Sequence, residues 1–139
     1  MTAYIYRMIA YSFPGLEIEY EYKDIDAVLY RSDGESTISH DKVEVAMDHE
    51  NNVRSIGKEL WNFAQHDFPL NVLITYTAEK DKHITTPHSD IMNTIISGKS
   101  RLMFILYPEH KWPGSYKIRG DRIRWRYYVY DKGTLNAVA

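Results

Sequence analysis

The sequence predicts a single α/β domain with a mixed central β-sheet flanked by helices. Its 139 residues are enough for one domain with a core of its own. Short segments in the first half alternate between apolar and polar side chains, which is typical of antiparallel strands with one exposed face. Amphipathic helical segments then separate short apolar strands, an order that favours parallel pairing. We therefore expect one domain over residues 1–139, with its core at about 2–108 and its elements in the order α-β-β-β-α-β-α-β-β-β.

A short helix and two strands are predicted at the N-terminal end. Residues 2–12 space their apolar side chains as one face of a helix does, and Pro14 and Gly15 follow as terminators. Residues 16–22 alternate between apolar and acidic side chains, so they predict a strand with one solvated face. Residues 25–30, IDAVLY, are rich in residues that favour β-structure and predict a second strand close behind the first.

A strand, a helix and another strand are predicted next. Residues 42–50 alternate with period two, as a third strand would. Asn51 and Asn52 are candidate N-caps for a helix over residues 53–64, where apolar side chains recur every three or four positions. Residues 70–76, LNVLITY, form a nearly continuous apolar run, the pattern of a central strand that is covered on both faces.

The remaining predicted elements are a helix, a strand and a hairpin. The helix is expected to have Thr86 as its N-cap and Pro87 at its first position, and to stop at Gly98. Residues 102–107 predict another buried strand. Residues 115–130 predict a C-terminal β-hairpin that turns at Gly120.

The composition excludes several classes of protein. The chain has no cysteine, which excludes disulfide frameworks, thiolate zinc sites, iron–sulfur clusters and cysteine nucleophiles. Its six histidines lack the spacing of a zinc-binding pair, and the glycine-rich loops of nucleotide-binding proteins are missing. No apolar run approaches the roughly 20 residues of a membrane span, and the N-terminus does not have the pattern of a signal peptide. We expect a soluble, intracellular protein of the cytoplasm with no membrane partner.

Charge is unevenly distributed along the chain, although the net charge is only −2. Residues 17–50 hold eleven acids against three bases, and residues 99–126 hold eight bases against two acids. One interpretation is that the first segment builds a cation site and the second a phosphate-binding surface. The alternative is that these charges only solvate the exposed faces of strands.

Three acidic residues form the candidate site. Asp26 interrupts an apolar strand, whereas Asp48 and Glu50 lie two positions apart at the end of another strand, so their side chains share one face. Adjacent strands lie about 4.8 Å apart, which lets the three carboxylates converge across the sheet. Converging carboxylates repel one another unless a cation or a proton intervenes, and hard oxygen ligands suit Mg²⁺ or Mn²⁺. The alternative is that the acids line a solvated strand end.

These acids and the elements around them resemble the PD-(D/E)xK, or restriction-endonuclease-like, nuclease superfamily. Residues 25–29, IDAVL, are similar to the first acidic motif of that family. Residues 45–51, VAMDHEN, are similar to the second motif in its acid-x-acid form, and residues 67–76 to the strand that follows the core helix. The resemblance covers about residues 2–77 and implies an α-β-β-β-α-β core with metal-dependent cleavage of phosphodiester bonds.

The resemblance also implies a role for each matching residue. Asp26 and Asp48 would bind Mg²⁺ or Mn²⁺, with the backbone carbonyl of His49 as a further ligand. Glu50 stands where the family usually has a lysine, and it would bind the metal or position and deprotonate the attacking water. Lys58, on the following helix, would replace that lysine and neutralise developing charge. The alternative for Lys58 is a solvated position on the helix surface.

Arginines in the predicted C-terminal hairpin form a candidate nucleic-acid-binding surface. Arg122, Arg124 and Arg126 occupy alternate positions, so one face of a strand would carry all three. Side chains at a strand spacing of about 6.6–6.8 Å can follow a row of phosphates. The alternative is that the charges protect an edge strand against aggregation.

These observations predict a metal-dependent endo- or exonuclease that hydrolyses phosphodiester bonds in DNA. A small domain of this kind has one cleavage centre, so cutting both strands of a duplex would need a homodimer. The same fold without catalysis predicts instead a module that binds nucleic acid or a protein partner, which the missing lysine of the acid-x-Lys motif favours. A third alternative is a structural α/β protein in which the acids have no chemical role.

Overall fold

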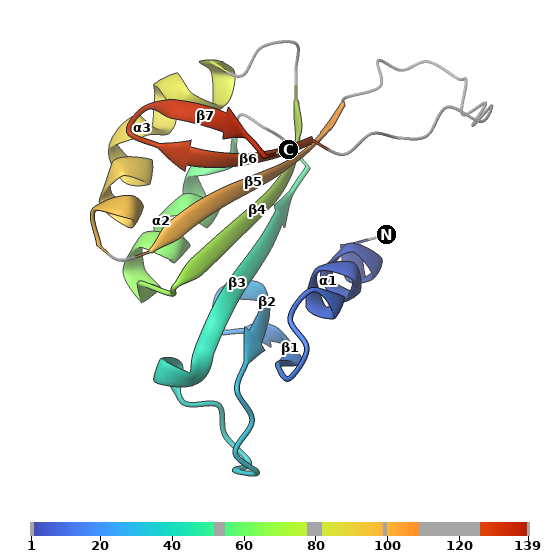
Figure 1. Ribbon diagram of the computed structural model, residues 1–139. Helices are drawn as coiled ribbons and strands as arrows, with labels where there is room; N and C mark the ends of the chain where they lie inside the picture. The colour runs from blue at the N-terminus through green and yellow to red at the C-terminus, as the bar shows by residue number, and fades with distance from the viewer. Residues whose placement is uncertain (1, 52–54, 78–81, 99, 109–125, 139) are drawn as a thin grey trace, which may run out of the picture.

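Seven strands form one mixed β-sheet in which the order in space is the order along the chain (Figure 1). The computed structural model describes residues 2–51, 55–77, 82–98, 100–108 and 126–138. With three helices, the sheet makes a single small α/β domain, as the sequence predicts. The strands are β1 (Glu17–Tyr22), β2 (Ile25–Tyr30), β3 (Val43–Glu50), β4 (Leu70–Thr77), β5 (Arg101–Pro108), β6 (Arg126–Asp131) and β7 (Thr134–Ala137).

Whether two neighbouring strands run parallel or antiparallel depends on the length of the segment that connects them. β3, β4 and β5 run parallel, whereas the pairs β1–β2, β2–β3, β5–β6 and β6–β7 are antiparallel. Parallel neighbours need a long crossover, which a helix supplies between β3 and β4 and again between β4 and β5. A two-residue turn joins β6 to β7, and its residues, Lys132 and Gly133, have φ angles of 42° and 91°. Positive φ at both positions is what a type I′ hairpin turn requires.

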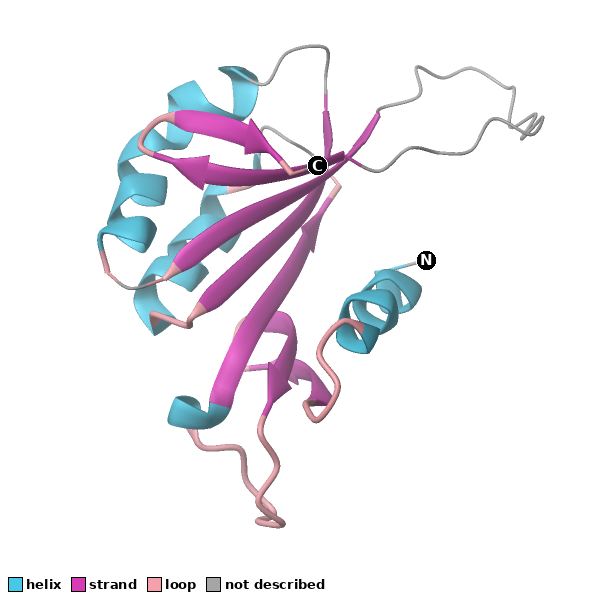
Figure 2. Ribbon diagram, viewed as in Figure 1, coloured by secondary structure: helices cyan, strands magenta, loops and turns pink. Residues whose placement is uncertain are grey.

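Helices cover both faces of the sheet (Figure 2). α2 (Gly57–His66) and α3 (Lys82–Ser97) lie side by side against one face, and α1 (Thr2–Tyr11) lies against the other. Each face therefore has its own hydrophobic core. Leu60, Phe63 and Met92 belong to the core under α2 and α3, whereas Ile5 and Tyr6 belong to the core under α1.

The central strand β4 is buried on both faces, as its apolar sequence predicts. Leu73 packs into the core under α2 and α3, and the next residue, Ile74, packs into the core under α1. Both side chains are at most 1% exposed. A strand with two apolar faces needs a covering layer on each side, so the position of β4 accounts for the three-layer arrangement.

The predicted order of elements is confirmed through β5, but both later helices begin elsewhere than predicted. α2 begins at Gly57 with Ile56 as its N-cap, because apolar spacing determines which face of a helix is buried and not where the helix starts. The prediction that Asn51 caps this helix is wrong. α3 begins at Lys82, so Pro87 lies inside it and not at its first position. There it removes one backbone hydrogen bond, which burial of the apolar face offsets.

The structure has a C-terminal hairpin that the sequence did not predict. It is formed by β6 and β7 and turns at Lys132 and Gly133, whereas the sequence predicted a turn at Gly120. Residues 109–125, which contain the predicted turn, lie outside the described residues. No helix within the described ranges is long and apolar enough to span a membrane.

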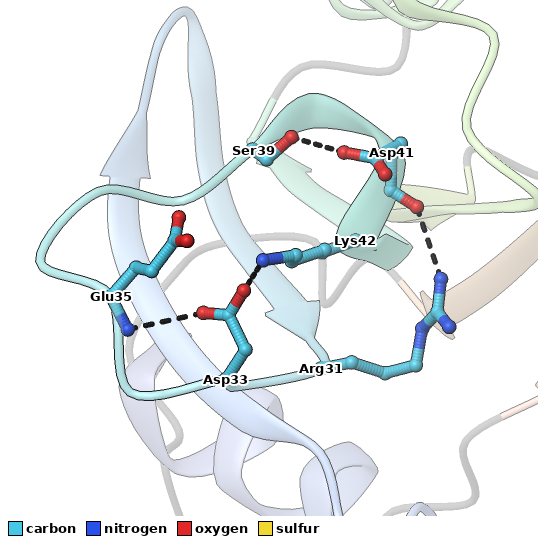
Figure 3. Close-up of polar contacts among 6 residues, drawn as sticks. All are labelled: Arg31, Asp33, Glu35, Ser39, Asp41 and Lys42. Atoms are coloured by element: carbon cyan, nitrogen blue, oxygen red, sulfur yellow. Dashed lines mark hydrogen bonds and ion pairs between the residues drawn. The ribbon is translucent and has the colours of Figure 1, made fainter.

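Polar contacts brace the loop between β2 and β3 (Figure 3). Lys42, in the short 3₁₀ helix η1 (His40–Lys42), makes an ion pair with Asp33, whose Oδ1 accepts the backbone N–H of Glu35 at 3.1 Å. The guanidinium of Arg31 donates to the carbonyl of Asp41 at 3.2 Å. These contacts hold the end of β2 close to the start of β3, which favours the strand register on which the candidate site depends.

Candidate functional site

Asp26 and Asp48 are neighbours across the β2–β3 pair. Ala27 pairs with Met47 in this antiparallel ladder, so the preceding residue of β2 lies beside the following residue of β3. The backbone N–H of Asp26 donates to Oδ1 of Asp48 at 2.7 Å, and the backbone N–H of His49 donates to Oδ2 of Asp26 at 3.0 Å. Each carboxylate thus binds the backbone of the other strand, and the two side chains hold each other in place.

Tyr6 links helix α1 to this carboxylate pair. Its hydroxyl donates to Oδ2 of Asp26 at 2.9 Å, and its side chain is only 3% exposed. Burial, together with the negative charge of Asp26, raises the pKa of Tyr6 above its usual range. The phenol therefore stays protonated and donates to Asp26. That oxygen accepts two hydrogen bonds, and Oδ1 of Asp26 accepts none from the described part of the chain.

Asp48 is the most strongly perturbed acid of the site. The residue is 2% exposed, and its Oδ2 is buried with no hydrogen-bond partner among the described residues. Burial raises the pKa of Asp48 to about 8, with further increases from the charges of Asp26 and Glu59. The hydrogen bond from Asp26 and the charge of Lys58 lower it in part. At neutral pH this carboxyl group holds a proton unless a cation takes the proton's place.

Glu50 ends β3 on the same side of the strand as Asp48. Its backbone carbonyl accepts the hydroxyl of Thr75 on β4 at 2.7 Å, which fixes the end of the strand. Burial lowers the pKa of His49, although the charges of Asp26 and Glu50 oppose this effect. The imidazole of His49 is therefore neutral at pH 7.

The first turn of α2 brings a cation and a further acid to the same place. Lys58 is exposed, and its charge lowers the pKa of both Asp48 and Glu59. Glu59 is half-buried, and its Oε2 is buried without a hydrogen-bond partner in the described chain. Burial raises the pKa of Glu59, and the charges of Glu50 and Asp26 raise it further. The charges of Lys58 and Glu59 therefore act on Asp48, and those of Asp26 and Glu50 act on Glu59.

The sequence reasoning therefore identified five of the residues described here, Asp26, Asp48, His49, Glu50 and Lys58, and missed two. Tyr6 and Glu59 were not singled out. Tyr6 lies on the apolar face of the first helix, where a hydroxyl needs a partner when it is buried. Glu59 directly precedes Leu60 on α2, so it borders the buried face of that helix. Each is a polar group at the margin of an apolar face, which is the signal that would have drawn attention to them.

Only part of the predicted arginine row is described. Arg126 begins β6, is exposed, and lies in the same cross-strand row as Glu50, with one residue of β4 and one of β5 between them. Three strand spacings of about 4.8 Å put roughly 14 Å between the two backbones. Arg122 and Arg124 lie outside the described residues.

The donor atoms of the site suit a hard divalent cation. Asp48 contributes a buried oxygen that has no hydrogen-bond partner in the described part of the chain, and every nearby acid offers oxygen ligands. Among the described residues, no three Asp, Glu, His or Cys side chains are gathered closely enough to hold a metal ion. Mg²⁺, however, usually keeps several waters and binds through one or two carboxylates together with substrate phosphates. The residues fit such a sparsely liganded ion.

No protein-family model matches the chain, and no curated protein matches it.

Proposed function

We propose that this protein is a metal-dependent nuclease that hydrolyses phosphodiester bonds in DNA. The observation that carries the proposal is the carboxylate of Asp48. It is buried at the end of a strand with one unpartnered oxygen, next to Asp26 and within electrostatic reach of Lys58. A buried carboxylate of this kind costs stability unless a cation joins it, so its burial supports a cation site.

Each residue of the site has a role in this proposal. Asp48 and Asp26 hold Mg²⁺ or Mn²⁺, with the backbone carbonyl of His49 as a further ligand. The ion, when bound, polarises the phosphodiester and lowers the pKa of a bound water. Glu50 orients the attacking water and accepts its proton. Lys58 neutralises the negative charge that develops on the phosphate during in-line attack.

The fold supports the same proposal. We infer a restriction-endonuclease-like core from the order α1-β1-β2-β3-α2-β4, which is the order that the sequence resemblance implies. In such a core the acid-x-acid segment ends the third strand, next to the strand that carries the first acid. Asp26 on β2 and Asp48 on β3 have this relation. The exposed Arg126, in the same cross-strand row as Glu50, is available to contact a DNA phosphate.

The proposal is tested by cleavage of labelled single-stranded, duplex and branched DNA with Mn²⁺ or EDTA. We expect cutting with Mn²⁺ alone, lost in Asp48→Ala and in Glu50→Ala. Glu44→Ala is the matched control, because Glu44 is an acid on the same strand that pairs with Arg31 away from the site. No cutting of any substrate by the wild-type protein, together with a melting temperature indifferent to Mn²⁺, would refute the proposal.

A second candidate is a module of the same fold that binds nucleic acid or a protein partner without cleaving it. Two observations favour it: Glu50 occupies the usual lysine position, and no three-ligand group exists in the described chain. This candidate predicts retention on a DNA column that weakens as salt is raised, and no metal-dependent products. Arg126→Ala should weaken that retention, whereas substitution of the control residue Glu44 should not.

A further inference from the structure

A hollow of about 540 Å³ opens on the α1 face of the sheet, where the segment after α1 passes the starts of β3, β4 and β5. Val45 of β3 lines it and lies three positions before Asp48, which is about 10 Å along the strand. Small-molecule sites typically have volumes of roughly 300–1,000 Å³. The hollow is therefore large enough for a small molecule and is distinct from the candidate site.

Apolar side chains make up most of the described lining of this hollow. Phe13 and Leu16 come from the segment between α1 and β1, and Val45 and Leu70 come from β3 and β4. Val45 belongs to the core under α1, whereas the other three pack against that core and stay partly exposed. Covering exposed apolar surface is favourable, so a ligand for this hollow needs an apolar body.

Arg101 supplies a positive charge to the hollow. It begins β5 and is exposed, and its backbone N–H donates to the carbonyl of Pro69 at 2.9 Å. Its carbonyl accepts the side-chain amide of Asn71 at 3.2 Å, so the backbone of Arg101 is anchored. Its guanidinium makes no hydrogen bond or ion pair with any residue that the structure describes. A guanidinium in this condition can bind a carboxylate through two parallel hydrogen bonds.

A second arginine lines the hollow without adding to its net charge. Nε of Arg31 pairs with Oε1 of Glu44 at 2.8 Å, and both side chains are part of the lining. The pair is neutral as a unit, so Arg101 gives the described lining a net charge of +1. A ligand with two negative charges, such as a phosphate dianion, would leave one of them facing Glu44 without a partner. The charge of the lining therefore favours a monoanion.

We propose that this hollow binds a small organic monoanion, a carboxylate on an apolar body, with Arg101 as its anion-binding residue. The apolar body covers the side chains of Phe13, Leu16 and Leu70, and the carboxylate pairs with the guanidinium. This binding requires neither a divalent cation nor DNA, so the inference does not depend on the proposed function.

The test is isothermal titration calorimetry at neutral pH with octanoate, which has one carboxylate and an apolar chain, and with 1-octanol, which has the same chain and no charge. We expect the wild type to bind octanoate and to bind 1-octanol roughly tenfold more weakly. Arg101→Gln should weaken octanoate binding roughly tenfold, because it removes the charged hydrogen bonds. Arg7→Gln is the matched control and should bind as the wild type does, because Arg7 is an exposed arginine on α1 outside the described lining.

Backbone amide shifts in ¹H–¹⁵N NMR spectra locate the bound octanoate. We expect shifts at Leu16, Leu70 and Arg101, and unchanged positions at Asp26 and Asp48. Because Arg101 is exposed, the melting temperature of Arg101→Gln should stay close to the wild-type value. Equal affinity for octanoate and 1-octanol, unchanged octanoate binding in Arg101→Gln, or no shifts around the hollow would each overturn the proposal, and none of these results bears on DNA cleavage.

Discussion

Replacing Asp48 with asparagine should stabilise the metal-free protein, and increasingly so as the pH rises. The carboxyl group is 2% exposed and its pKa is about 8 in the folded protein, whereas an aspartate in an unfolded chain has a pKa of about 3.9. Asparagine keeps an oxygen that can accept the N–H of Asp26, but it carries no charge. The substitution therefore removes the cost of ionising a buried acid and retains the hydrogen bond that positions it.

The magnitude follows from proton linkage. Between pH 4 and pH 8 the folded protein holds the proton of Asp48 while the unfolded chain has released it. The folded state thus binds more protons, and its stability falls as pH rises, by about 1.4 kcal/mol per pH unit. From pH 5 to pH 8 the wild type should lose about 4 kcal/mol relative to Asp48→Asn through this group. That is a large share of the roughly 5–15 kcal/mol that stabilises a typical domain.

Urea unfolding of both proteins at several pH values, in EDTA, measures this difference. Histidines with lowered pKa, such as His66 and His88, give the opposite trend, because the stability that depends on their neutral form is lost as pH falls. That trend is common to both proteins and cancels in the difference. Glu44→Gln should follow the wild type at every pH. Parallel stability curves for wild type and Asp48→Asn would show that the buried carboxyl group does not titrate as the structure requires.

Four further substitutions test parts of the structure whose stability does not depend on the ionisation of Asp48. Tyr6→Phe removes the hydrogen bond to Asp26 and should lower the free energy of unfolding by about 1–2 kcal/mol in urea. Phe63→Ala should cost about 3–5 kcal/mol because Phe63 is fully buried, whereas Trp61→Ala, at a side chain 56% exposed on the same helix, should cost less than about 1 kcal/mol. Lys132→Asn should stabilise by roughly 0.5 kcal/mol, since asparagine tolerates the positive φ of this turn better; a lower melting temperature would contradict this.

Much of the fold could be predicted because its strands differ in pattern. The alternation in residues 16–22 indicated a strand with one exposed face, and β1 is the first edge strand of the sheet. The continuous apolar run in residues 70–76 indicated two covered faces, and β4 is central. Period and polarity report how many faces a segment buries, and this number largely determines its place in a sheet.

Boundaries and turns could not be predicted to the same degree, because they depend on energies from the whole fold. Pro87 would favour a helix start locally, yet α3 begins earlier and gains from burying Met92 and Ile95. Gly120 and Gly133 are comparable turn signals in the sequence. The structure has a turn at Gly133, where β6 also pairs with β5, and Gly120 lies outside the described residues. For α3, packing against the rest of the fold outweighs the helix start that Pro87 favours locally.

In the candidate site, too, some contacts could be predicted from the sequence and others could not. The closeness of Asp26 and Asp48 could be predicted, because strand register alone brings them together. The approach of Tyr6 and Glu59 could not, because it depends on how α1 and α2 pack against opposite faces of the sheet. A sequence pattern within one sheet is local enough to interpret, whereas a contact between layers needs the assembled core.

The carboxylates of Asp26 and Asp48 differ in how completely they are hydrogen-bonded. Asp26 accepts two hydrogen bonds on one oxygen, from α1 and from β3, so its carboxylate joins three elements of the fold. Asp48 accepts one hydrogen bond and keeps a buried oxygen without a partner. A carboxylate whose hydrogen bonds are satisfied contributes mainly position, whereas one that is buried and incompletely satisfied gains most from a cation. In the proposed mechanism a bound cation would therefore stabilise Asp48 most, and Asp26, besides its proposed contact with the metal, also holds Asp48 and the end of β3 in place.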